Sequence, residues 1–183
     1  FGALRVPVRE RTEIRVEAEE STGTIRTLTV VHEQGQLQLG AYAAPRSAGI
    51  WDEVRAQIVS SLSGSGGTVD EHDGVMGPEV RATVTVKDGK RTGTQRVRFM
   101  GVDGPRWFLR GVISGPAAVD DEAAKDLLDV FRSVVVVRGG DPHAPHEQLP
   151  LRMPRDAEPV EEPGPRRPED NPFRRGPEIT EIR

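Results

Sequence analysis

Residues 78–89, PEVRATVTVKDG, decide the fold of this chain. Small apolar side chains recur at every second position, at Val80, Ala82, Val84 and Val86. This period of two is typical of a strand with one buried face. The strand runs into Asp88-Gly89, a dipeptide that favours the tight turn of a β-hairpin. The stretch therefore predicts an antiparallel hairpin, completed by residues 94–101.

The chain on either side extends this hairpin. Asp103-Gly104 predicts a second turn, followed by a strand over residues 106–114. Upstream, we expect an edge strand at residues 4–8, where Pro7 cannot donate a hydrogen bond, and strands at residues 12–17. A turn is expected at Glu20–Gly23, and after it a hairpin joins residues 24–32 to 36–44 through Gln34-Gly35. Residues 68–72 are expected to form a short strand. Because hairpins dominate, the sheet should be mostly antiparallel, with at most a mixed edge.

Two segments change from a period of two to a helical period. The first follows Ser47, a plausible N-cap, and ends at the glycine-rich residues 64–67. Its apolar stripe is Trp51, Val54, Ile58 and Leu62. The second follows the potential cap Asp120, and its stripe is Ala124, Leu127, Leu128 and Phe131. We expect both helices on one side of the sheet, and residues 134–137, four valines, as a strand buried on both faces.

The composition changes at residue 139. Ten of the fifteen prolines lie in residues 139–183, among many charges. We therefore predict an α+β domain at residues 1–138 and a Pro-rich, charged, largely disordered tail at 139–183. Within the tail, Leu149-Pro150-Leu151 with Met153 could lie extended across the surface of the domain.

The composition also limits the function. The net charge of −4 disfavours nucleic acid and anionic lipid as partners, and the absence of cysteine excludes disulfides, thiolate metal sites and a cysteine nucleophile. No apolar run is long enough to span a bilayer, and no signal peptide is visible. We expect a cytoplasmic protein without a cofactor. The chain begins at Phe1, which leaves open whether a segment precedes it.

No catalytic or metal site can be assembled from the sequence. His143 and His146 are three residues apart, but Pro142 and Pro145 forbid a regular helix there. His32 and His72 end predicted strands without a recognisable nucleophile. Residues 64–67 lack the lysine of a phosphate loop, and Asp70, Glu71 and Asp73 do not match a calcium-binding loop. An enzyme is the least favoured class.

Two candidate binding elements remain. The first is a sheet face that carries Arg96, Arg98, Arg106, Phe108 and Arg110, which could bind an acidic peptide or single-stranded nucleic acid. A solvated face with cross-strand ion pairs explains the same arginines. The second is the terminal motif with Phe173, Pro177, Glu178, Ile179 and Ile182, which could add a strand to a partner. An inert tail is the alternative there.

Several motifs resemble a known family. GAYAAPR at residues 40–46, Ile50-Trp51 and GPRWFLRG at residues 104–111 resemble an actinobacterial family described only as domain of unknown function 3710. The resemblance covers residues 1–154 and 176–181, and implies no activity. The layout is also similar to PsbP-like domains, in which a last helix delivers a Ser-x-x-Val strand, as at Ser133–Val136. PsbP-like domains serve varied roles, so this likeness leaves the function open.

Three functions follow in order of preference. The first is a non-catalytic protein-interaction or scaffold domain with an unidentified protein partner. The second is a small-ligand-binding module. The third is a weak binder of single-stranded nucleic acid through the arginine-bearing face.

Overall fold

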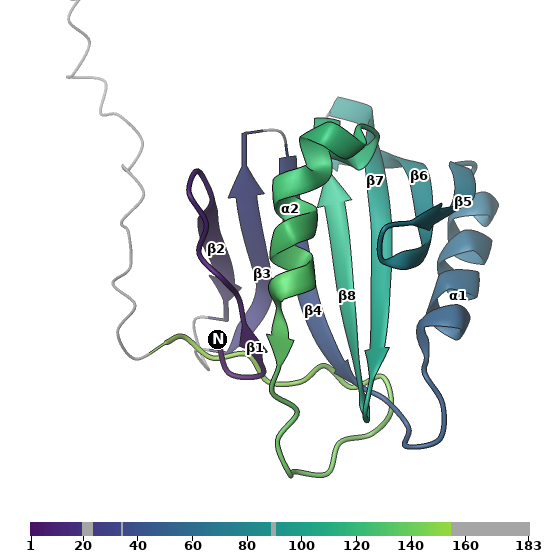
Figure 1. Ribbon diagram of the computed structural model, residues 1–183. Coiled ribbons are helices and arrows are strands. Elements are labelled where there is room, and N and C mark those ends of the chain that lie inside the picture. The colour runs from purple at the N-terminus through teal and green to yellow at the C-terminus, as the bar shows by residue number, and fades with distance from the viewer. Residues whose placement is uncertain (20–23, 34, 89–90, 155–183) are drawn as a thin grey trace, which may run out of the picture.

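The computed structural model describes residues 1–19, 24–33, 35–88 and 91–154. Among them, seven strands form one sheet in the order β2-β3-β4-β8-β7-β6-β5, and every neighbouring pair is antiparallel. The strands of this sheet are β2 (Glu13–Ala18), β3 (Ile25–His32), β4 (Gly35–Ala43), β5 (Thr68–Gly74), β6 (Gly77–Asp88), β7 (Arg91–Gly104) and β8 (Trp107–Ser114). The helices are α1 (Trp51–Gly64), the short 3-10 helix η1 (Pro116–Ala118) and α2 (Asp121–Ser133). The predicted α+β class with a mostly antiparallel sheet is confirmed (Figure 1).

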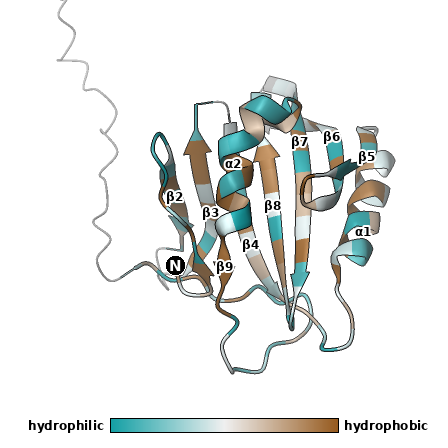
Figure 2. Ribbon diagram, viewed as in Figure 1, coloured by the Kyte–Doolittle hydropathy of each residue, from teal (hydrophilic) through white to brown (hydrophobic). Residues whose placement is uncertain are grey.

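The hairpins follow the expected pairing. His32 pairs with Gly35 and Asp88 with Arg91, so β3 pairs with β4 and β6 with β7 as predicted. Gln34 and Gly89 of the predicted turns lie outside the described residues. The expected turn at residues 20–23 also lies outside them. Figure 2 shows β8 as mostly hydrophobic with a hydrophilic band, and its neighbours Phe108 and Leu109, which lie on opposite faces, are both buried.

The two helices cover opposite faces of the sheet, so the expectation of one shared side is wrong. The α2 face carries Leu109 and Ile113 of β8, and a Cβ on Gly111 would lie 2.7 Å from the ring of Phe131 in α2. The α1 face carries Phe108 and Arg110, and Gly101 pairs with Arg110. A Cβ on Gly101 would lie 2.4 Å from Trp51 in α1. In Figure 1, α2 crosses β3, β4 and β8, whereas α1 lies beside β5 and β6.

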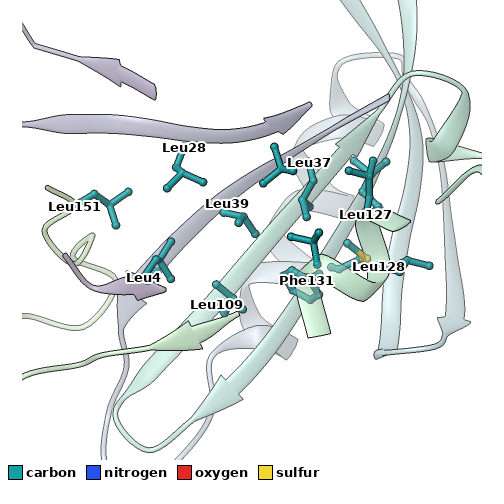
Figure 3. Packing of buried hydrophobic residues seen from close by; sticks show 14 of the residues in the cluster. Leu4, Leu28, Leu37, Leu39, Leu109, Leu127, Leu128, Phe131 and Leu151 are labelled. Atoms are coloured by element: carbon teal, nitrogen blue, oxygen red, sulfur yellow. The ribbon is translucent and has the colours of Figure 1, made fainter. Parts of the chain in front are cut away.

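The larger core lies between α2 and its face of the sheet. Among the described residues it contains twenty-one that are buried, including Leu28, Leu37, Leu127 and Phe131 (Figure 3). The smaller core beneath α1 contains Ala44, Ile50, Trp51 and Phe108. Each helix packs against its own face of the sheet, which explains why both helical stripes are apolar.

Four valines at residues 134–137 do not form the predicted doubly buried strand. Only Val135–Val136 is a strand, β9, and it pairs with β1 (Leu4–Arg5) in a separate two-stranded sheet. Val135 and Val137 are 53% and 40% exposed. A continuous apolar run can thus cover the margin of a core instead of crossing it.

Residues 139–154 correct the predicted domain boundary at residue 138. Leu149 and Leu151 are each 1% exposed and belong to the larger core. The Leu149 amide donates to the Ala41 carbonyl at 2.8 Å, and Leu151 bridges to Ile25. We call residues 146–151 the strap, because they fill the gap that opens between β3 and β4 beyond the Leu28–Leu39 pair. The expected extended course of this segment is found, but as part of the core; residues 155–183 lie outside the described chain.

The N-terminus of α1 is capped from a distant strand. Ser47 is not the N-cap, because the helix begins at Trp51 with Ile50 before it. The Asp103 carboxylate on β7 accepts the Ile50 amide at 2.8 Å and the Trp51 amide at 3.2 Å. By contrast, Asp120 caps α2 as expected and accepts two backbone amides.

We expect Asp103→Ala to lower the free energy of unfolding by about 1 kcal/mol, because it leaves two amides without their acceptor. Ser47→Ala is the matched control and should change stability by less than about 0.5 kcal/mol. Chemical denaturation of both variants measures the difference. A larger loss for Ser47→Ala would show that the helix is capped locally.

No helix among the described residues is long and apolar enough to cross a membrane.

Candidate binding cleft

The five residues of the predicted arginine face do not share a surface. Arg96 and Arg98 lie on the α2 face of β7, whereas Phe108 and Arg110 lie on the α1 face of β8. Arg106 lies in the β7–β8 turn, with a φ of 63°. The reason is the register: Phe99 pairs with Val112, so it shares a face with Arg110 and not with Leu109.

Phe108 and Arg110 are held by aromatic neighbours. Phe108 is 1% exposed and stacks on Trp51 with the ring centroids 5.7 Å apart. The Trp51 indole donates to the Pro78 carbonyl at 2.8 Å. The Arg110 guanidinium lies over the Tyr42 ring, 5.1 Å from its centroid. Phe108 is therefore a core residue, which excludes it as a direct contact for a partner.

Arg98 is buried in an ion-pair network. Its side chain is 1% exposed, and its guanidinium contacts Glu79, also 1% exposed, at 2.8 Å and Asp121 at 2.8 Å. Arg81 contacts the same two carboxylates, each at 2.9 Å. We call these four residues the charged cluster. It joins β6 and β7 to the first turn of α2, and its two cations balance its two anions.

The cluster shifts the pKa of two of its members. Partial burial alone would raise the pKa of Asp121, but the guanidinium groups of Arg81 and Arg98 outweigh it and hold the pKa below its ordinary value of 3.8. Partial burial alone would lower the pKa of Arg81, but the hydrogen bond to Glu79 and the nearby carboxylates raise it above its ordinary range. Both shifts favour the charged forms of Asp121 and Arg81.

This shift predicts a pH-dependent contribution of Asp121 to stability. A lowered carboxyl pKa stabilises the fold above the ordinary value, and the contribution is lost as the pH falls through the folded-state pKa. The difference in unfolding free energy between the native chain and Asp121→Asn should therefore shrink from about pH 5 downwards. Urea unfolding across that range measures it. A difference that stays constant down to low pH would contradict the assignment.

A cleft of about 390 Å³ opens on the α2 face beside the charged cluster. It is formed by the strands that α2 does not cover, and Val119, which follows η1, closes one side. Its lining residues are Thr68, Asp70 and His72 of β5, Arg81, Ala82 and Thr83 of β6, Arg96 and Val97 of β7, and Val119. Arg96 is exposed, and no described residue lies within ion-pair or hydrogen-bond distance of its side chain. The cleft thus offers a cation whose donors no described residue uses.

The chain matches a protein family over most of its length. The family described as "Protein of unknown function (DUF3710)" matches residues 1–159. The chain belongs to the DUF3710 family. Its matched region runs past residue 138, and so includes the strap of this DUF3710 domain.

Comparisons with curated proteins and with solved structures do not extend this family assignment. None of the curated proteins compared with the chain matches it. A crystal structure from Bacteroides thetaiotaomicron, at 1.50 Å resolution, is similar with a TM-score of 0.41 and 9% sequence identity. The similarity covers 77% of this chain and 47% of that one, so the DUF3710 chain spans about half the length of that protein.

The histidines do not meet in one site of the DUF3710 domain. His143 lies 3.0 Å from Glu147, and its hydrogen bond holds the pKa of that carboxyl below the ordinary range. His146 lies 4.0 Å from Glu53 in α1, and His32 lies 3.2 Å from Asp126 in α2. The described residues contain no group of three or more side chains that could hold a metal ion.

The other predicted motifs are dispersed. Asp70 lines the cleft, whereas Glu71 contacts Arg55 of α1 at 2.9 Å. The terminal motif around Phe173 and Ile179 lies outside the described residues.

Sequence reasoning missed the threonines of the cleft, although a signal for them exists. The period of two at Val80, Ala82, Val84 and Val86 places Thr83 on the other face of β6, and the observed pairing of Asp88 with Arg91 sets Thr83 opposite Arg96. The role of Thr68 and Val119 depends on contacts distant in sequence, which no local pattern encodes.

Proposed function

We propose that this DUF3710 domain is a non-catalytic protein-interaction domain that binds its partner in the cleft of β5, β6 and β7. Exposed Arg96 carries the proposal, because a cation that has no partner among the described residues and lies inside a concave surface is suited to an acidic group of another molecule. The charged cluster supports it, since it fixes β6, β7 and α2 around the cleft before a partner arrives.

Site-specific photocrosslinking in the source cells tests this proposal. A photoreactive residue in place of Thr68 should give a discrete protein adduct, and Arg96→Glu should abolish it by charge repulsion. The same probe in place of Gln38, an exposed residue on the α1 face, is the matched control. Equal adducts at Thr68 and Gln38, or adducts that are still formed in the Arg96→Glu variant, would contradict the proposal.

A small-ligand-binding module is the second candidate. The cleft volume of about 390 Å³ falls within the range of known ligand sites, roughly 300–1,000 Å³. Native mass spectrometry of protein purified from its source separates this case, since a retained small molecule adds a fixed mass. Binding of single-stranded nucleic acid has less support, because Arg98 is buried and the net charge is −4.

Two expectations from the sequence remain part of the proposal. The terminal motif with Phe173, Pro177, Glu178, Ile179 and Ile182 is a second candidate contact, and partner capture with and without residues 172–183 tests it. A cytoplasmic location is also expected, and fractionation of source cells measures it.

A further inference from the structure

One row of polar side chains crosses the floor of the cleft. Thr68 pairs with Thr83, and Thr83 pairs with Arg96, so the three residues lie side by side on adjacent strands and on one face. Adjacent strands are about 4.8 Å apart, so the row spans roughly 10 Å. We call these three residues the donor row.

The donor row has hydrogen-bonding capacity that the described part of the chain does not use. Within that part, none of the three side chains has a hydrogen-bond or ion-pair partner. Each threonine hydroxyl can donate one hydrogen bond, and the guanidinium has five N–H donors in a planar fork. Such a fork matches the two oxygens of a carboxylate.

The charges around the donor row decide the charge of its ligand. The charged cluster next to it is neutral overall, so it adds little net attraction. Arg96 adds one positive charge, and Asp70 places one negative charge on the rim. A carboxylate that pairs with Arg96 carries one negative charge toward Asp70, whereas a phosphate dianion carries about two and would be repelled more strongly.

The cleft also has one apolar wall, formed by Val119, which is 42% exposed. Ala82 and Val97 pair with each other and alternate with Thr83 and Arg96, so their side chains point to the opposite, α1 face of the sheet. An aliphatic side chain next to the acidic one would remove Val119 from water. We propose, on the basis of the function proposed above, that the donor row binds the side-chain carboxylate of a glutamate or aspartate flanked by aliphatic residues in a partner protein segment.

Nuclear magnetic resonance titration of the full chain tests this inference. The probes are a capped valine–glutamate–valine peptide, the same peptide with glutamine, and inorganic phosphate. The glutamate peptide should shift the amides of Thr68, Thr83 and Arg96, and the glutamine peptide should bind at least about tenfold more weakly. Phosphate should bind more weakly than the glutamate peptide.

Three variants assign the contact. Arg96→Gln and Thr83→Val should each weaken binding of the glutamate peptide, by about tenfold or more and by several-fold respectively. Arg46→Gln removes one positive charge from an exposed loop residue, and should leave binding unchanged. The amide spectrum of each variant checks that it folds.

Each contrary result has a defined meaning. Equal binding of the glutamate and glutamine peptides overturns the carboxylate assignment but leaves the cleft as a docking site. Tighter binding of phosphate, or no shift of the donor row with any probe, also overturns the inference. The photocrosslinking experiment separately decides whether a partner protein uses the cleft.

Discussion

Replacing Leu149 or Leu151 by alanine is expected to lower the free energy of unfolding by about 2–5 kcal/mol for each variant. Both side chains are 1% exposed in the larger core, although they follow a Pro-rich stretch that reads as a tail. Each truncation removes apolar contacts and leaves a cavity between β3, β4 and the strap. Such a loss is a large fraction of the stability of a typical domain, about 5–15 kcal/mol.

Met153→Ala is the matched control, because Met153 follows the strap but is 41% exposed. It should change the unfolding free energy by less than about 0.5 kcal/mol. Urea denaturation of the three full-length variants provides the comparison. Similar, small losses for all three would show that the strap lies on the surface and that the domain ends earlier.

Glu79→Leu is expected to cost about 3–5 kcal/mol, because it leaves the buried Arg98 guanidinium with Asp121 as its remaining anion in the cluster. Arg98→Leu should cost a similar amount, since Glu79 then relies on Arg81. The double variant should cost clearly less than the sum, because an apolar pair replaces a charged one. A double-mutant cycle from denaturation curves measures this coupling.

Arg15→Leu is the control for this cycle. Its ion pair with Glu13 has a similar length, 3.0 Å, but the two side chains are 59% and 64% exposed. Exposed pairs contribute about 0–1 kcal/mol, so this variant should have little effect. Additive losses in the Glu79–Arg98 cycle would mean that the two side chains do not stabilise each other, and would contradict the prediction.

The sequence predicts the elements of this fold well because their signals are local. The alternation at Val80–Val86 and the turn at Asp88-Gly89 depend on neighbouring residues, and the helical stripes depend on residues three or four apart. Asp120 caps α2 from the adjacent position, so it was predictable. Asp103 caps α1 from 52 residues away, so it was not.

The placement of the arginines shows where local reasoning ends. Arg96 and Arg98 alternate with Val97 and Phe99 as expected, but which face α2 covers depends on long-range packing. Both residues are arginines, so the residue type does not predict that Arg98 is 1% exposed whereas Arg96 is exposed. The strap was missed for a related reason, since its burial depends on a gap between two distant strands.

The central claim is that Arg98 holds the fold together whereas Arg96 binds a partner. Nuclear magnetic resonance signals of the two arginine side chains test it most directly. In the full chain, the Arg98 Nε–H donates to Glu79 at 2.9 Å in the interior, so it should exchange slowly with water and should not shift when the valine–glutamate–valine peptide is added. The Arg96 Nε–H should exchange rapidly in the free protein and shift on titration. A protected, unresponsive Arg96 together with a responsive Arg98 would contradict the account.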